Sequence, residues 1–247
     1  MKKQATLERD AASDAIDMLL SALRMNGQVC GREMLTADTP DCYISSILLP
    51  EATALQETHN NRYVNDALKK IQDAGLSAPE CFATEDMDSR GVCVCETPQS
   101  LFLYATYVSL DSPLRCGDCG LSRPLYRVPP TKEEEYNDII CWQSDYQCCD
   151  RLQMNCRNLE RAAMRQLSRL DSSLSRDGLA ICRRICELTG IPTYHYLYRY
   201  GGRSLRKERQ RLCPACQSEW LLAEPWHDFD FKCDKCRLIS NIAHNVI

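Results

Sequence analysis

Residues 212–241 read LCPACQSEWLLAEPWHDFDFKCDKCRLISN and contain two Cys-x-x-Cys pairs, separated by sixteen residues. Each pair can place two thiolates on one tetrahedral ion, and two such turns at the ends of a hairpin complete a four-thiolate zinc site. We therefore predict a zinc ribbon. Its Zn²⁺ ligands would be Cys213, Cys216, Cys233 and Cys236.

The pair at 213–216 alone would also suit a dithiol that exchanges electrons, but the matching second pair favours a closed metal site. Four cysteine ligands leave no open coordination position, so the zinc is expected to be structural. His227 lies between the pairs, and we interpret it as a turn or surface residue rather than a ligand.

The composition is typical of a globular protein, except for the cysteines. The chain has 247 residues, 44% hydrophobic and 26% charged, with seventeen cysteines. The start MKKQATLERD lacks the apolar run of a signal peptide, and no apolar stretch reaches the roughly 20 residues that span a bilayer. We therefore expect a cytoplasmic protein without membrane partners, whose cysteines are metal ligands or free thiols.

The net charge of −4 is unevenly distributed. From Arg199 onward the chain carries nine Lys or Arg and six Asp or Glu, a net +3, which leaves −7 for residues 1–198. Because an acidic body repels phosphate, any affinity for nucleic acid is expected at the C-terminal end.

Hydrophobic periodicity predicts an α+β fold in three parts. The first, 1–130, is a mixed domain with helices at 7–26 and 63–75, a buried strand at 42–50 and β-rich segments within 90–110. The second, 131–202, has three helices within 133–189 and a Tyr-rich strand at 191–202. The third, 203–247, is the zinc ribbon.

The sequence also predicts a second metal site. Cys93-Val-Cys95 and Cys116-Gly-Asp-Cys119 are separated by twenty residues, and glycine lets the chain turn tightly around an ion. The alternative is that Cys93 and Cys95 share one face of a strand while the later pair shapes a turn. Six further cysteines fall on predicted helices: Cys141, Cys148, Cys149, Cys156, Cys182 and Cys186. Cys182 and Cys186 are four residues apart and could share a ligand, but we interpret them as core residues because they continue an apolar stripe.

Cations surround the C-terminal pairs, and aromatic residues lie among them. Cations would contact phosphates and exposed rings would stack on bases, as in proteins that bind single strands. The predicted nucleic-acid-binding residues are Arg203, Arg206, Lys207, Arg209, Arg211, Trp220, Lys235 and Arg237. The alternative is a solvated linker with aromatics that pack the ribbon. The tyrosines at 194, 196, 198 and 200 are interpreted as a sheet face packed on helices rather than a stacking platform.

The segments SPLRCGDCGLSRPLYRVP, CDRLQMNC, GIPTYHYLYRYGG, CPAC and FDFKCDKCRLISN resemble an uncharacterised bacterial family of unknown function, described as zinc-ribbon-containing with a suggested nucleic-acid-binding role. The resemblance covers nearly the whole chain and implies zinc ligation by the four C-terminal cysteines. Gln217 stands where ribbons often have glycine, which predicts a less tight first turn.

The leading functional hypothesis is a non-enzymatic zinc-ribbon protein that binds nucleic acid through 199–240. The alternative is a protein-interaction module whose acidic body covers a basic partner, such as an antidote (immunity) protein that blocks a toxin or nuclease. The sequence shows no catalytic constellation, so we predict that the chain is not an enzyme.

Overall fold

The computed structural model describes residues 1–2, 9–82 and 91–246, which form two compact units. Unit 1 comprises Met1–Val92, Leu110–Ser112 and Ser122–Asn137, and the remainder is unit 2. Helices and sheets both occur, which confirms the mixed α and β composition. Among the described residues, no helix combines the length and apolar character needed to cross a membrane.

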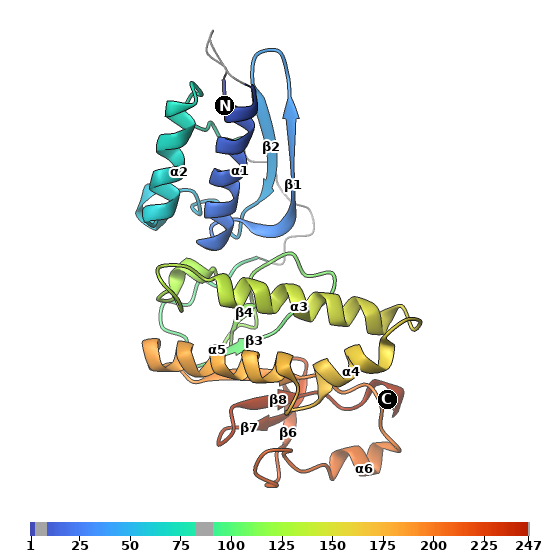
Figure 1. Cartoon of the computed structure of the whole chain (residues 1–247). Helices are drawn as coiled ribbons and strands as arrows, with labels where there is room; N and C mark the ends of the chain where they lie inside the picture. Colours follow the sequence, from blue (N-terminus) through green and yellow to red (C-terminus); the bar gives the residue numbers. More distant parts are fainter. Residues whose placement is uncertain (3–8, 83–90, 247) are drawn as a thin grey trace. The chain divides into compact units, whose positions relative to one another are not determined.

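Unit 1 packs two helices beside a hairpin (Figure 1). Its elements are α1 Arg9–Met25, β1 Cys30–Asp38, β2 Tyr43–Leu48, η1 Glu57–His59, α2 Arg62–Asp73 and η2 Leu125–Arg127. The apolar positions of α1 recur every three or four residues, so Ile16 and Leu19 enter a core that also contains Ile71 of α2. Both predicted helices are confirmed, although Leu7 lies outside the described residues.

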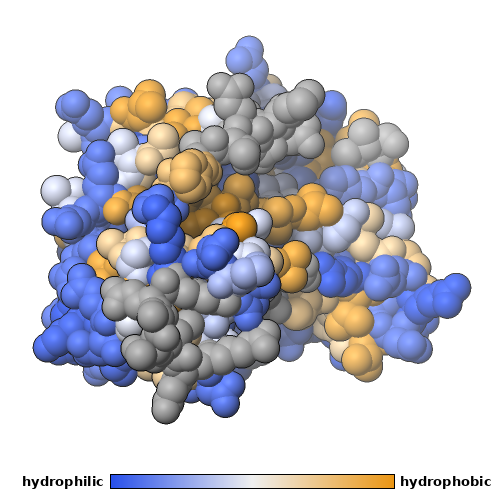
Figure 2. All heavy atoms as spheres, turned by 90° about the horizontal axis from the view of Figure 1, so that it is seen from above, coloured by the Kyte–Doolittle hydropathy of each residue, from blue (hydrophilic) through white to orange (hydrophobic). Residues whose placement is uncertain are grey.

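The buried strand predicted at 42–50 is instead β2, a half-exposed strand of the hairpin. β2 alternates between inward and outward residues, and Ile44 is 55% exposed. A two-stranded sheet with helices on one face leaves its other face to solvent, which accounts for the exposure. Figure 2 shows hydrophobic residues in separate groups among hydrophilic ones on the face that it presents.

Unit 2 contains a six-stranded mixed sheet. The strands, in the order β4-β3-β5-β8-β7-β6, are β4 Leu114–Cys116, β3 Leu101–Leu103, β5 Thr193–Leu197, β8 Leu238–Ser240, β7 Phe229–Cys233 and β6 Leu221–Trp226. The neighbours β3, β5 and β8 are parallel, whereas β4, β7 and β6 are each antiparallel to the strand beside them. Within 90–110 only β3 is a strand, and Arg90 lies outside the described residues.

Unit 2 also contains helices, one of which approaches the sheet closely at a glycine. The helices are α3 Asn137–Met154, α4 Glu160–Ser168, α5 Ser173–Thr189 and α6 Leu205–Arg209, followed by η3 His244–Val246, so the three predicted central helices are confirmed. At Gly178 of α5, an added Cβ would lie 2.5 Å from the ring of His195 on β5. Only glycine allows helix and strand to approach so closely at this point.

The units divide the chain differently from the three parts expected from the sequence. Residues 93–109 and 113–121, expected in the first part, belong to unit 2 together with the whole C-terminal segment. All eight cysteines of the two predicted metal sites consequently lie in one unit.

Candidate metal centres and basic surface

The C-terminal cluster consists of Cys213, Cys216, Cys233 and Cys236. Their sulfur atoms all lie within 4.8 Å of one another, and the Sγ atoms of Cys216 and Cys233 are 3.7 Å apart. A tetrahedral ion with Zn–S bonds of about 2.3 Å requires sulfur–sulfur distances of about 3.8 Å. The donor set and its spacing therefore fit a metal ion.

Hydrogen bonds of the first turn prepare a thiolate. The backbone N–H of Gln217 donates to the carbonyl of Cys213 at 2.9 Å, and that of Cys213 donates to the carbonyl of Ser218 at 2.9 Å. Hydrogen bonds from the side chain and backbone of Ser218 lower the pKa of Cys216 to about 6, whereas burial raises the pKa of Cys213 and of Cys236. A thiol that ionises readily is a better metal ligand.

Gln217 does not loosen the first turn. It adopts the left-handed conformation with φ 57°, as do Arg237 after the second C-terminal pair, with φ 54°, and Gly120 after Cys119, with φ 74°. Gly120 N–H also donates to the carbonyl of Cys116 at 2.9 Å, which repeats the bond pattern of Gln217. The prediction of a less tight first turn is therefore wrong, because Gln217 adopts the backbone conformation that glycine usually has at this position.

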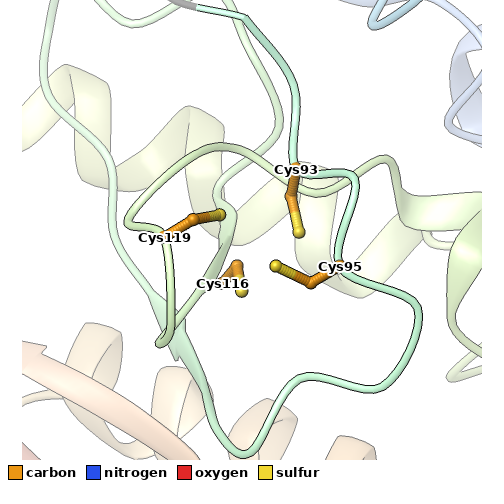
Figure 3. Close-up of side chains that lie close together, drawn as sticks. All are labelled: Cys93, Cys95, Cys116 and Cys119. Carbon is orange, nitrogen blue, oxygen red and sulfur yellow. The ribbon is translucent and has the colours of Figure 1, made fainter.

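The internal cluster consists of Cys93, Cys95, Cys116 and Cys119, whose sulfur atoms also lie within 4.8 Å of one another. Figure 3 shows the four side chains converging, two from the loop before β3, one from the last residue of β4 and one from the turn that follows β4. Cys93 and Cys95 lie in a loop, not on a strand face as the alternative interpretation supposed. Cys93 and Cys116 are buried, whereas Cys119 is exposed.

The loop and the turn of the internal cluster are joined independently of any sulfur atom. The backbone N–H of Gln99 donates to both carboxylate oxygens of Asp118, at 3.2 and 3.1 Å. The N–H of Gly117 donates to the carbonyl of Ser100 at 2.8 Å. These bonds hold the two halves of the cluster together without a covalent link, since none of the seventeen cysteines forms a disulfide.

The cysteines on helices do not form a common core. Cys182 is buried, and burial raises the pKa of its thiol. Cys149 and Cys186 are half-buried, whereas Cys141, Cys148 and Cys156 are exposed. The core interpretation is therefore confirmed for Cys182 and only in part for Cys186, whereas Cys141, Cys148 and Cys156 lie on the outward sides of their segments.

Four predicted nucleic-acid-binding cations are exposed around the short helix α6: Arg203, Arg206, Lys207 and Arg209. Within the described part of the chain, none of these side chains forms an ion pair. Ser204 caps α6 by accepting from the N–H of Lys207 at 3.3 Å.

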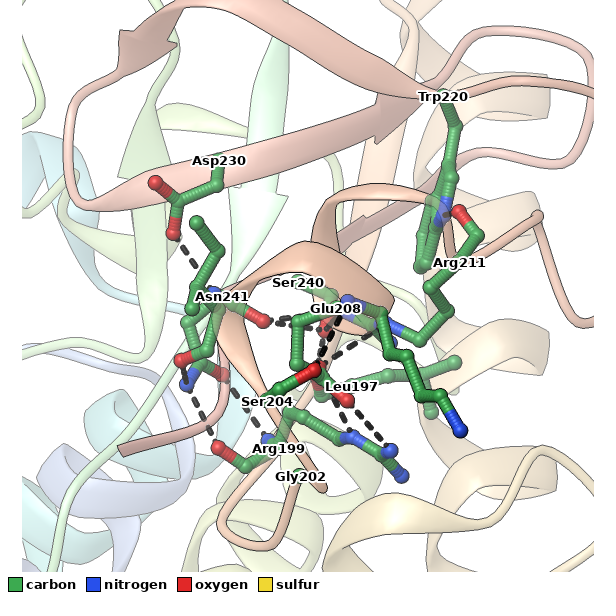
Figure 4. Close-up of polar contacts among 12 residues, drawn as sticks. Leu197, Arg199, Gly202, Ser204, Glu208, Arg211, Trp220, Asp230, Ser240 and Asn241 are labelled. Atoms are coloured by element: carbon green, nitrogen blue, oxygen red, sulfur yellow. Dashed lines mark hydrogen bonds and ion pairs between the residues drawn. The ribbon is translucent and has the colours of Figure 1, made fainter. Parts of the chain in front are cut away.

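Glu208, the one acidic residue of α6, is turned inward. Its carboxylate accepts from Arg199 at 2.8 and 3.2 Å and lies 3.5 Å from Arg211, and its side chain is only 4% exposed (Figure 4). Sequence reasoning counted Glu208 against the neighbouring cations. The structure pairs it with two other arginines. The outward face of α6 therefore carries more positive charge than a count of charges along the local sequence indicates.

Arg211 and Trp220 are packing residues, which corrects their predicted role at a binding surface. Trp220 is 3% exposed, and its Nε1–H donates to the carbonyl of Arg211 at 2.9 Å. The guanidinium of Arg211 lies 5.0 Å from the Trp220 ring and 4.3 Å from the Phe231 ring. Burial lowers the pKa of Arg211 to about 10.

The other predicted contact residues divide between surface and interior. Lys235 is exposed, whereas Arg237 is half-buried and donates to the hydroxyl of Tyr194 at 3.1 Å. Phe229 is buried against Tyr196, with ring centroids 5.2 Å apart. The tyrosine face of β5 therefore packs on the β6–β7 hairpin, while His195 on its opposite face meets α5.

Sequence reasoning missed one contact between the two ends of unit 2. Trp226 Nε1–H donates to the carbonyl of Gly117 at 3.1 Å, and His227 Nε2 lies 2.8 Å from the same oxygen. The only signal in the sequence was the pair of glycines in Cys-Gly-Asp-Cys-Gly, which permits close approach but does not name the neighbour.

Three domain families match the chain in succession, each described as a domain of unknown function: DUF8589 over residues 2–85, DUF2310 over 95–198 and DUF8594 over 202–246. No solved structure matches the chain. An uncharacterised protein of Haemophilus influenzae is 34% identical over 244 residues, covering 96% of this chain and 94% of the relative. A second uncharacterised protein of Haemophilus influenzae is 39% identical over 164 residues, covering 66% of this chain and 81% of the relative. The chain therefore belongs to the same family as these two uncharacterised bacterial proteins.

Proposed function

We propose that this chain is a non-enzymatic protein that binds nucleic acid through the outward face of α6, on a zinc-ribbon scaffold stabilised by Zn²⁺ in the C-terminal cluster. The cluster offers four cysteine sulfur atoms within 4.8 Å of one another, and a four-cysteine site leaves no open coordination position, which suits a structural ion. Cys213 follows α6 by only four residues, so the ion would fix the chain close to the binding helix.

The observation that carries the proposal is the inward pairing of Glu208 with Arg199 and Arg211. This pairing anchors α6 by one side and leaves Arg206, Lys207 and Arg209 facing solvent. Unpaired cations on an anchored element meet phosphates at little entropic cost, because the backbone that carries them is already ordered.

The mode of binding differs from the stacking expected from the sequence. Trp220, Phe229 and Phe231 are buried, so their rings offer no face to a base. The exposed ring nearest to α6 in the sequence is Tyr200, at 45%. We therefore propose phosphate contacts with little sequence preference, in place of an aromatic platform.

The test compares two triple variants of equal charge change. Arg206→Gln/Lys207→Gln/Arg209→Gln removes the cations of α6, and Lys69→Gln/Lys70→Gln/Arg161→Gln removes three exposed cations elsewhere. Fluorescence anisotropy with labelled DNA and RNA oligonucleotides gives the affinity at several salt concentrations. We expect the α6 variant to lose about 10- to 100-fold in affinity and about 2 to 3 in the slope of log K against log salt.

The control variant should stay close to the wild type in both quantities. Equal losses in the two variants would show that net charge alone matters, which contradicts an α6 interface. A wild-type chain that binds no oligonucleotide would also contradict the proposal and favour a protein partner on the acidic residues 1–198.

A further inference from the structure

The turn of the internal cluster carries a second set of contacts, from the tip of the β6–β7 hairpin. The carbonyl of Gly117 accepts from Trp226 Nε1–H at 3.1 Å and lies 2.8 Å from His227 Nε2. An added Cβ at Gly117 would lie 2.0 Å from Ser100 Oγ and 2.8 Å from Cζ2 of Trp226. The hairpin tip and the turn therefore fit together only because residue 117 has no side chain.

Gly120 repeats this fit on the other side of the same turn. An added Cβ there would lie 3.0 Å from Nδ1 of His227, and the residue has φ 74°. The ring of His227 is thus held between the carbonyl of Gly117 and the backbone of Gly120. Phe102 of β3 packs against both rings of the tip, with its ring centroid 5.4 Å from that of Trp226 and 5.8 Å from that of His227.

The base of the same hairpin carries the C-terminal cluster. Lys232 N–H donates to the carbonyl of Trp220 at 2.8 Å, and Leu221 pairs with Phe231. Cys233 ends β7 and pairs with Leu238 across the second turn. One hairpin therefore contacts the internal cluster at its tip and supplies a ligand of the C-terminal cluster at its base.

We propose that Cys93, Cys95, Cys116 and Cys119 bind a second Zn²⁺, and that this ion strengthens zinc binding at the C-terminal cluster by fixing the hairpin through Gly117. The proposal rests on the zinc in the C-terminal cluster proposed above, but not on nucleic-acid binding. An ion at the internal cluster orders the turn, the ordered turn holds Trp226 and His227, and the hairpin then meets the C-terminal ion already arranged. Linkage requires the effect to be reciprocal.

The experiment measures zinc content by elemental analysis and zinc affinity by competition with a chromophoric chelator, on the full chain. The variants are Cys116→Ser/Cys119→Ser, Cys213→Ser/Cys216→Ser, and Trp226→Phe/His227→Asn, which keeps all eight ligands. Asparagine is chosen because residue 227 has φ 55°, a conformation that it tolerates well. Cys81→Ser/Cys148→Ser removes two exposed cysteines outside both clusters and serves as control.

We expect two zinc ions in the wild type, in the control and in the hairpin-tip variant, and one in each cluster variant. Removing the internal cluster or altering the tip should weaken the C-terminal site by about tenfold, the loss usual when groups behind metal ligands are changed. One zinc in the wild type with none lost in Cys116→Ser/Cys119→Ser would overturn the second site. Two zincs whose affinities are unchanged in the tip variant would overturn the coupling. If the zinc content does not fall in Cys213→Ser/Cys216→Ser, the C-terminal cluster binds no zinc, whatever the result for the internal cluster.

Discussion

Glu208 stands between Lys207 and Arg209 in the sequence, yet its carboxylate contacts Arg199 and Arg211 instead. A charge count treats neighbours along the chain as neighbours in space, and a helix breaks that assumption because consecutive side chains point in different directions. The carboxylate is 4% exposed, so its charge is stabilised only while both guanidinium groups remain in place.

Glu208→Gln should therefore destabilise unit 2 by about 2 to 3 kcal/mol, since Arg211 would keep a largely buried charge without its counter-ion. The figure is below that of a fully buried pair because Arg199 is 38% exposed. Urea unfolding followed by tryptophan fluorescence gives the free energy. Glu219→Gln, at an exposed position, is the control, and an equal effect of both changes would contradict the buried role.

His195 is fully enclosed between β5 and α5, and burial lowers its pKa to about 3, from 6.5. The folded state thus keeps the imidazole neutral, while the unfolded state takes up a proton below pH 6.5. Stability is then lost as the pH falls from 6.5 toward 3, by about 2 kcal/mol at pH 5 relative to pH 8.

A comparison with His195→Gln isolates this effect, because acid effects shared by both proteins, including zinc release, cancel in the difference. The wild type should lose about 2 kcal/mol of its free energy of unfolding relative to the variant between pH 8 and pH 5. A difference that is the same at both pH values would show that His195 is protonated in the folded state as readily as in the unfolded chain.

At the scale of elements, three turns of unit 2 share one backbone conformation but not one residue type. Gly120 adopts the left-handed region without steric cost, whereas Gln217 and Arg237 adopt it with a Cβ present. Gln217→Gly should relieve this strain and raise the free energy of unfolding by about 1 kcal/mol. Thermal unfolding of the zinc-loaded protein measures this change in the free energy of unfolding. Gly120→Ala is the opposite change and should be destabilising, because its Cβ meets His227.

Elements differ in how far the sequence predicts them. α1 and α2 follow from periodicity, because a long amphipathic pattern has few other solutions. β3, β4 and β8 have three residues each, and their position in the sheet depends on partners up to 92 residues away, as in the pairing of Leu101 with Thr193. No local pattern records such pairing, so the sheet that unites the two clusters could not be predicted.

At the scale of the molecule, the eight cysteines were predicted as two groups by their spacing, and the structure brings each group together. Their relation was not predictable, since it depends on a hairpin tip that meets a turn more than 100 residues earlier in the chain. The basic surface was predicted in part. The side chains of Arg206 and Lys207 are exposed, whereas that of Arg211 is packed inward. This difference follows from the burial of Glu208, which composition does not predict.

Both clusters belong to unit 2, and so do all three tryptophans, Trp142, Trp220 and Trp226. Unit 1 has its own apolar core around α1 and α2, and none of its residues belongs to either cluster. Metal binding that occurs only in the folded state stabilises the part that binds it. Chelation should therefore lower the unfolding temperature of unit 2 and leave that of unit 1 unchanged.

The distribution of tryptophans makes this test direct. Tryptophan fluorescence reports unit 2 alone, whereas far-ultraviolet circular dichroism reports the helices of both units. After treatment with a zinc chelator we expect the fluorescence transition to move to lower temperature, while the dichroism curve splits and keeps a transition at the original position of unit 1. A dichroism curve that moves as a whole would mean that the units unfold together, and unchanged fluorescence would mean that neither cluster's metal supports the sheet.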